Sequence, residues 1–147
     1  TFTYVGEDKK YFSGKNKGII KYNEWKICLR VCYDLRFPVW SRNNENYDLL
    51  IYVANWPSPR INAWDRLLCA RAIENCCYSV GVNCIGEDPN NNKYPGHSSA
   101  YDYYGNLISD KLSNNSENIN ISIDLQSLLK YRKKFGFLKD QDSFELC

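Results

Sequence analysis

The sequence has 147 residues, of which 44% are hydrophobic and 24% are charged, and its net charge is +2. These values are typical of one globular domain that spans residues 1–147. A charge this small does not favour a nucleic-acid partner, and no apolar run approaches the roughly 18 residues of a membrane span. We therefore predict neither a nucleic-acid partner nor a membrane partner.

The cysteines indicate the compartment of the protein. There are seven of them, an odd number, and they are scattered through segments with strand or helix patterns. This usage favours a reducing, cytoplasmic location over a disulfide framework. The spacings of Cys28 with Cys32, and of Cys76, Cys77 and Cys84, do not form the close pairs of a zinc site. We predict no metal and no cofactor.

The first half of the chain predicts strands that flank a short helix. Ile27, Leu29 and Val31 alternate with polar or small residues in period two, which predicts a strand that stops at Cys32. Pro38 then opens a helix, because proline is tolerated in a first turn. We expect strands over residues 17–22, 25–32 and 47–54, and the helix over residues 39–43.

The second half predicts a long helix followed by short strands. Asn62 is expected to cap a helix that runs to about Cys77, with Cys69, Ala72, Ile73 and Cys76 as its apolar stripe. Strands are expected over residues 78–85, 98–104, 107–110 and 119–123, a polar loop over 87–95, and a helix over 125–134. Sheets covered by helices place the chain in the α/β (α+β) class.

Cys32 stands apart from the other cysteines, whose best explanation is packing in the core. It falls where a strand turns into a helix, in the stretch Cys32-Tyr33-Asp34-Leu35-Arg36-Phe37-Pro38. Such a corner exposes the sulfur and directs backbone N–H groups at the atom that the sulfur attacks. Cys32 is therefore the candidate nucleophile.

This stretch resembles the nucleophile segment of the nitrilase superfamily, the carbon-nitrogen hydrolases, and in particular their omega-amidase branch. Further matching segments follow in the order of the family: Gly6-Glu7, Asn55-Trp56-Pro57, residues 70–75, Gly81-Val82-Asn83, Gly96-His97-Ser98 and residues 134–140. The resemblance implies a nitrilase-like αββα four-layer sandwich. Because members of the family are about twice as long, we expect this chain to be a C-terminal portion of that fold, and we expect a homodimer.

The resemblance also implies catalytic roles. Cys32 would attack the amide carbonyl, the backbone N–H of Tyr33 would bind the oxyanion, and Glu7, about 25 residues before Cys32, would match the second glutamate of the family. The family's lysine and its first glutamate would fall before Thr1. We therefore expect the 147-residue chain alone to be inactive. The alternative is a catalytically silent remnant that serves as a binding or dimerisation module.

The substrate implied by the resemblance is a short dicarboxylic monoamide such as 2-oxoglutaramate or 2-oxosuccinamate, whose side-chain amide is hydrolysed to acid and ammonia. Arg60 and Arg36 are the candidates for binding its carboxylate, since an arginine fork binds carboxylate bidentately. Arg60 could instead be an exposed loop residue, and Arg36 a structural ion-pair partner. Trp56, next to Asn55, could be a pocket wall or simply core.

Two other motifs have simple structural interpretations. His97, Ser98 and Asp102 lie too close along one expected strand to face one another as a catalytic triad, so we interpret them as structural. The basic run Lys130-Tyr131-Arg132-Lys133-Lys134 could suggest nucleic-acid binding, but cations are also favoured near the C-terminal end of a helix. A solvated helix face is the preferred interpretation.

Overall fold

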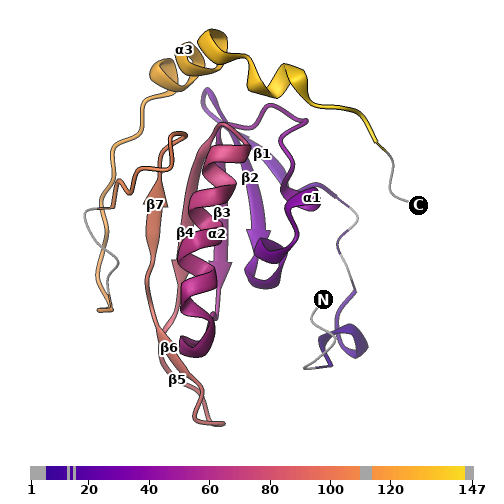
Figure 1. The fold of residues 1–147 in the computed structure, drawn as a ribbon. Helices are drawn as coiled ribbons and strands as arrows, with labels where there is room; N and C mark the ends of the chain where they lie inside the picture. The colour runs from indigo at the N-terminus through magenta and orange to yellow at the C-terminus, as the bar shows by residue number, and fades with distance from the viewer. Residues whose placement is uncertain (1–5, 13, 15, 110–113, 145–147) are drawn as a thin grey trace.

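The computed structural model describes residues 6–12, 14, 16–109 and 114–144. Its main element is a five-stranded sheet with the order β1-β2-β3-β4-β7 (Figure 1). The strands are β1 (Ile19–Tyr22), β2 (Trp25–Val31), β3 (Leu49–Ala54), β4 (Tyr78–Asn83) and β7 (Ser99–Tyr101). The two edge strands pair antiparallel with their neighbours, whereas β2, β3 and β4 are parallel.

The parallel arrangement decides where polar groups gather. Parallel neighbours need crossover connections, and here these contain η3 (Cys32–Arg36) with α1 (Pro38–Ser41), then η4 (Ser58–Arg60) with α2 (Ile61–Glu74). The carboxyl ends of β2, β3 and β4 consequently meet at one edge of the sheet. Ligand sites of open α/β sheets lie at this edge.

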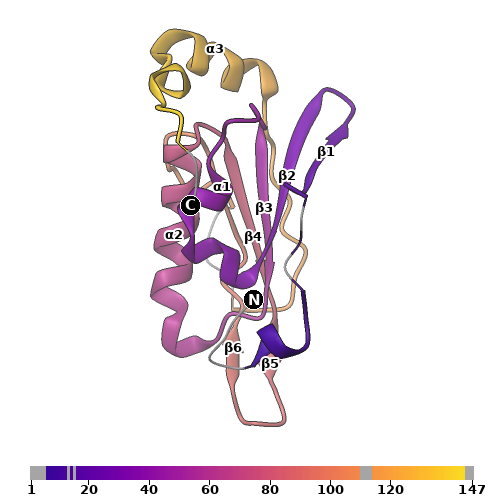
Figure 2. The same ribbon diagram turned by 90° about the vertical axis from the view of Figure 1, so that its right-hand side faces the viewer.

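The core lies between α2 and one face of the sheet, as Figure 2 shows. Trp64, Leu68 and Ala72 of α2 are fully buried against residues such as Leu50 and Tyr52 of β3. The helix approaches β4 so closely that a Cβ on Gly81 would lie 2.3 Å from Cδ1 of Leu68. Glycine is required at this position because any side chain would displace the helix.

The opposite face of the sheet has an apolar surface that is largely open. Leu29, Val31, Val53 and Val82 are 43%, 62%, 50% and 50% exposed. They are neighbours, because Val31 pairs with Val53 and Val53 pairs with Val82. Contiguous exposed apolar patches of this kind are typical of interaction surfaces.

The remaining elements extend from this sheet. β5 (Ile85–Glu87) and β6 (Lys93–Pro95) form a hairpin beyond the carboxyl edge, at the bottom of Figure 1. Helix α3 (Leu125–Phe135) crosses the opposite end and is followed by η5 (Phe137–Asp140). The η2 turn (Glu7–Lys9) lies near the N-terminus. Among the described residues, no helix is long and apolar enough to cross a bilayer.

Arg132 attaches α3 to the sheet. Its guanidinium donates to the Asp48 carboxylate at 2.7 Å, to the Tyr47 carbonyl at 2.6 Å and to the Cys76 carbonyl at 2.7 Å. The Arg132 and Asp48 side chains are only 12% and 8% exposed. The interpretation of residues 130–134 as a solvated face is therefore wrong for Arg132, although Lys130, Lys133 and Lys134 are exposed.

The predicted fold class is confirmed, with sheets and helices mixed along the chain. The helix over residues 125–134 and the strands near 17–22, 25–32 and 47–54 are present with small shifts. No strand forms over residues 119–123. Of the strand expected over residues 107–110, residue 110 lies outside the described residues, and Leu107 makes an isolated bridge to Tyr101. The loop expected over residues 87–95 is present over residues 88–92 but is shorter than predicted, because Glu87 ends β5 and Lys93–Pro95 forms β6.

The prediction of α2 was wrong in two details. The η4 turn runs directly into the helix, so α2 begins before Asn62 and its Ncap, Arg60, makes no side-chain capping bond. The buried stripe is Trp64, Leu68, Arg71 and Ala72, whereas Ile73 is 48% exposed. The apolar pattern could not predict Arg71 in this stripe, because arginine is charged and is buried here through hydrogen bonds to Leu35 and Glu74.

Candidate active site

Cys32 occupies the expected corner between β2 and η3. Its φ is +43°, in the left-handed region that non-glycine residues rarely adopt. The Asp34 carboxylate accepts a hydrogen bond of 3.0 Å from the backbone N–H of Val31, and the Asp34 carbonyl accepts one of 3.0 Å from Phe37. Strain of this kind costs about 1–3 kcal/mol and persists only where the surroundings impose it.

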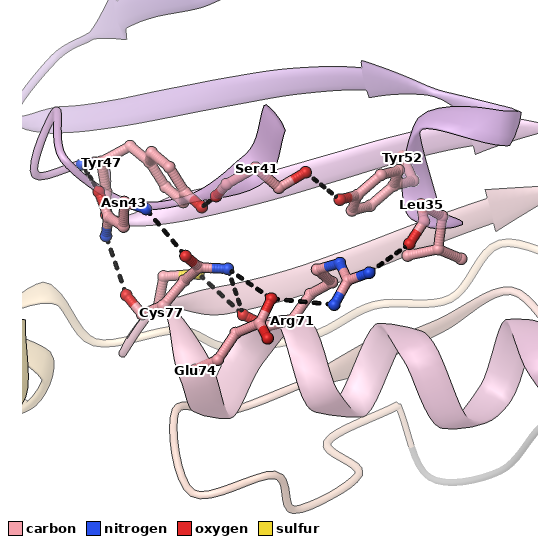
Figure 3. Close-up of polar contacts among 9 residues, drawn as sticks. Leu35, Ser41, Asn43, Tyr47, Tyr52, Arg71, Glu74 and Cys77 are labelled. Atoms are coloured by element: carbon pink, nitrogen blue, oxygen red, sulfur yellow. Dashed lines mark hydrogen bonds and ion pairs between the residues drawn. The ribbon is translucent and has the colours of Figure 1, made fainter. Parts of the chain in front are cut away.

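Helix α2 and its end support this corner from behind (Figure 3). The buried Arg71 guanidinium donates to the Leu35 carbonyl of η3 at 2.6 Å and to Glu74 at 2.9 Å. Farther along, the Ser41 and Tyr52 hydroxyls share a hydrogen bond of 2.6 Å. These contacts fix η3 and α1 against the core, so the position of the sulfur is determined by buried groups.

The segment after β3 forms the next wall. The register that pairs Val31 with Val53 brings this segment beside Cys32, and a backbone hydrogen bond from Asn55 acts to lower the pKa of the Cys32 thiol. The Trp56 ring is buried, packs on Trp64 at a centroid separation of 5.6 Å and donates from Nε1 to the Arg60 carbonyl at 2.8 Å. The Arg36 guanidinium lies 5.2 Å from the centre of the Trp56 ring. Trp56 is thus part of the core and also part of the wall.

Opposing effects act on the Cys32 thiol. Burial raises its pKa above the ordinary value, and the charges of Glu7 and Asp34 act in the same direction. The Asn55 hydrogen bond and the Arg60 charge lower the pKa, but burial has the largest effect. A thiol must be a thiolate to attack a carbonyl. The surroundings of Cys32 therefore favour the neutral thiol over the thiolate, mainly through burial.

One broad, open groove contains every residue predicted for the site. Its lining includes Glu7, Cys32, Tyr33, Arg36, Asn55, Trp56 and Arg60. Glu7 reaches the groove from η2 and Arg60 from η4, and both side chains are exposed. Tyr33 packs edge-on against Phe37 at 5.0 Å. The roles assigned to these residues remain predictions.

The Gly96-His97-Ser98 turn has a structural role. The His97 imidazole Nδ1 lies 3.0 Å from the Asp65 carboxylate, and the Ser98 hydroxyl bonds to the backbone of Asn83. Asp102 instead accepts from the backbone of Tyr104 and Asn106. These three side chains do not form a triad. Within the part of the chain that is described, no group of three or more His, Cys, Asp or Glu residues could hold a metal ion.

The sequence did not reveal several residues at this edge. Asn83 belonged to a matching segment without a role, yet it is buried and holds the segment that contacts Cys32. Tyr94 of β6 lines the same groove, and its hydroxyl donates to Asp88 at 2.9 Å. The β3–β4 pairing places Asn83 at this edge, and the β5–β6 hairpin places Tyr94 there.

Comparison with known proteins settles the family. The family model described as carbon-nitrogen hydrolase matches residues 3–133. The chain belongs to the carbon-nitrogen hydrolase family. It is 41% identical over 145 residues to the omega-amidase YafV of Yersinia enterocolitica, and 33% identical over 142 residues to the 2-oxoglutaramate amidase of Bacillus subtilis. The resemblance to the nitrilase superfamily and its omega-amidases is therefore confirmed.

The structure agrees with this membership. A solved CN-hydrolase superfamily protein from Xanthomonas campestris, with an arsenic adduct in its active site, superposes with a TM-score of 0.90 at 37% identity. The chain is covered to 99%, 95% and 99% in the Yersinia, Bacillus and Xanthomonas comparisons. It spans only 57%, 54% and 58% of those proteins, a little over half of their length.

Proposed function

We propose that this chain is the nucleophile-bearing part of an amidase that hydrolyses the side-chain amide of a short dicarboxylic monoamide. The observation that carries the proposal is Cys32, held at φ +43° in a groove that Glu7 and Arg60 also line. The names of the relatives, omega-amidase and 2-oxoglutaramate amidase, support an amide substrate of this type.

In the proposed reaction the Cys32 thiolate attacks the amide carbonyl and forms a C–S bond. The carbonyl oxygen becomes an oxyanion, which the Tyr33 backbone N–H would bind. The tetrahedral intermediate collapses, the C–N bond breaks, and the nitrogen leaves as ammonia after it receives a proton. Water then attacks the thioester, releases the acid and returns the proton to the sulfur.

The raised pKa of the Cys32 thiol supports a role for further groups beside the sulfur. A cation beside the sulfur would lower that pKa, and a carboxylate would accept and return the proton. We propose that a lysine and a glutamate outside this sequence supply these functions, and that Glu7 orients the lysine or the substrate amide. The 147-residue chain alone is then expected to show no amidase activity.

Arg60 is the proposed carboxylate reader. Arg60 lines the groove and its charge acts on Cys32. Arg36 also lines the groove, and its guanidinium lies over the face of Trp56. A guanidinium there could pair with the far carboxylate of 2-oxoglutaramate or 2-oxosuccinamate while the amide lies at the sulfur. Asn55 and Trp56 would form the adjacent wall.

A homodimer is proposed as the assembly. Trp64 is fully buried and is excluded from any interface, but Trp40 of α1 is 63% exposed and lies beside the half-exposed Val39. An exposed tryptophan of this kind is typical of an interface. Sedimentation at micromolar concentration should show a dimer, and a strict monomer would remove the proposal.

The odd number of cysteines supports a cytoplasmic location as a further prediction.

The test of the activity is ammonia release from 2-oxoglutaramate by the full-length protein. Replacing Cys32 by alanine should reduce turnover by more than about a thousandfold and leave the fold intact, because the half-buried sulfur is not part of the deep core. Retained turnover in Cys32→Ala would refute the nucleophile. Absence of turnover in the wild-type protein would favour the silent binding module instead.

A further inference from the structure

Asn83, the last residue of β4, holds the segment that faces Cys32. It is 5% exposed, and its side-chain oxygen accepts a hydrogen bond of 2.6 Å from the Trp56 backbone N–H. Its side-chain nitrogen donates to the Trp56 carbonyl at 3.0 Å and to the Gly96 carbonyl at 2.7 Å. Both amide donors are thus used. The side chain grips both backbone groups of one residue.

The gripped residue lies between two groups that act on the sulfur. Asn55, one residue before Trp56, follows β3 at the point where the pairing of Val31 with Val53 brings the chain beside Cys32, and its backbone N–H acts to lower the pKa of that thiol. Arg60, four residues after Trp56, accepts at its carbonyl from Trp56 Nε1 at 2.8 Å. Fixing the Trp56 backbone therefore fixes the approach of the Asn55 N–H and the course of the η4 turn.

We propose that Asn83 is a positioning residue that keeps the Asn55 backbone N–H directed at the Cys32 sulfur. The inference takes from the proposed function the choice of Cys32 as the thiol of interest, but it concerns the charge state of that thiol and not its reaction with a substrate. The hydrogen bonds of the Asn83 side chain go to the backbones of Trp56 and Gly96, and none of them goes to the Cys32 sulfur. It acts on the thiolate through Trp56 and Asn55, so its loss should be seen as weaker stabilisation of the charged sulfur.

The chain contains a matched control. Asn43 is 1% exposed, accepts from the Tyr47 N–H at 2.8 Å, and donates to the carbonyls of Tyr47 and Asn75 at 2.9 Å each. It therefore makes the same three kinds of bond (Figure 3). It holds the segment before β3, at the opposite end of the strand from Asn55. Replacing either asparagine removes equivalent hydrogen bonds, but only replacement of Asn83 should change the pKa of the Cys32 thiol.

The experiment measures the alkylation of Cys32 by iodoacetamide as a function of pH in the full-length protein. Mass spectrometry of the Cys32 peptide separates this thiol from the other cysteines. Asn83→Ala should move the midpoint of the profile up by about one pH unit, and slow alkylation about tenfold below the midpoint. Asn43→Ala should lower the thermal midpoint of unfolding comparably and leave the alkylation profile within about twofold.

An unchanged profile in a folded Asn83→Ala variant overturns the inference, and so does an equal shift in Asn43→Ala. Asn83→Ser, which retains a polar group in the site, is measured alongside and should show the same shift if the alanine variant does not fold; an unchanged profile there also overturns the inference. No substrate is used. A shifted profile in a protein that hydrolyses no amide would therefore refute the proposed function and leave this inference in place.

Discussion

Replacing Val53 by threonine in the full-length protein tests whether the open face of the sheet becomes covered. The two side chains are nearly isosteric and both are β-branched, so strand propensity and volume hardly change. Val53 is 50% exposed in the structure and pairs with the equally exposed Val82. If another layer packs on this face, as the αββα sandwich implies, the new hydroxyl becomes buried without a partner.

The size of the effect follows from this exposure. Covering the remaining half of a valine removes apolar surface worth about 1 kcal/mol, and an unpartnered buried hydroxyl costs about 1–3 kcal/mol. We expect Val53→Thr to lower the free energy of unfolding by about 2 kcal/mol, and Val82→Thr to act alike. Urea denaturation at unchanged m value is the assay. A change within about 0.5 kcal/mol at both positions would show that the face stays open and would refute the covering layer.

Three further predictions follow from the described contacts. Arg132→Ala should destabilise the protein by about 3 kcal/mol, because the buried Asp48 carboxylate loses its ion-pair partner. Lys133 is exposed, and Lys133→Ala should change stability by less than about 0.5 kcal/mol. Equal effects of the two variants in chemical denaturation would contradict the role of Arg132 in attaching α3 to the sheet. Burial raises the pKa of Cys77 well above its ordinary value, so at high pH the folded state keeps a proton that the unfolded state loses. The free energy of unfolding should therefore fall by about 1.4 kcal/mol per pH unit above about pH 9. Cys77→Ala should reduce this slope, and an unaltered slope would show that Cys77 does not cause it. Arg60→Ala should lower kcat/KM for carboxylate-bearing amides by an amount equivalent to about 1.5–3 kcal/mol of lost transition-state stabilisation, and should hardly change kcat/KM for uncharged amides. An equal loss on both kinds of amide would mean that Arg60 only shapes the loop.

The nucleophile corner could be predicted because its signals are local. Period-two alternation identified β2, and Pro38 marked the start of α1, so the position of Cys32 followed from adjacent residues. The positive φ of Cys32 left no trace in the sequence, since it is imposed by Asp34 and by the support of Arg71. Local pattern thus located the corner, and packing determined its geometry.

The rest of the site depends on contacts between distant residues. Asn83 and Trp56 meet because β3 and β4 are parallel neighbours, and this pairing cannot be predicted from the sequence of either strand. Asp65 and His97 meet only after α2 packs on the sheet. Glu7 was recognisable through family resemblance alone, because an exposed glutamate in a short polar turn carries no signal of its own.

The most direct test of the central claim is to capture the acyl intermediate. The full-length protein is mixed with 2-oxoglutaramate, quenched in acid within the turnover time and digested with a protease. The mass of the Cys32 peptide is then measured by mass spectrometry. We predict that this peptide gains the mass of the acyl group, that is, substrate minus ammonia, and that Cys32→Ala shows neither adduct nor turnover. An adduct on a different residue, or undiminished ammonia release by Cys32→Ala, would contradict the assignment of Cys32 as the nucleophile.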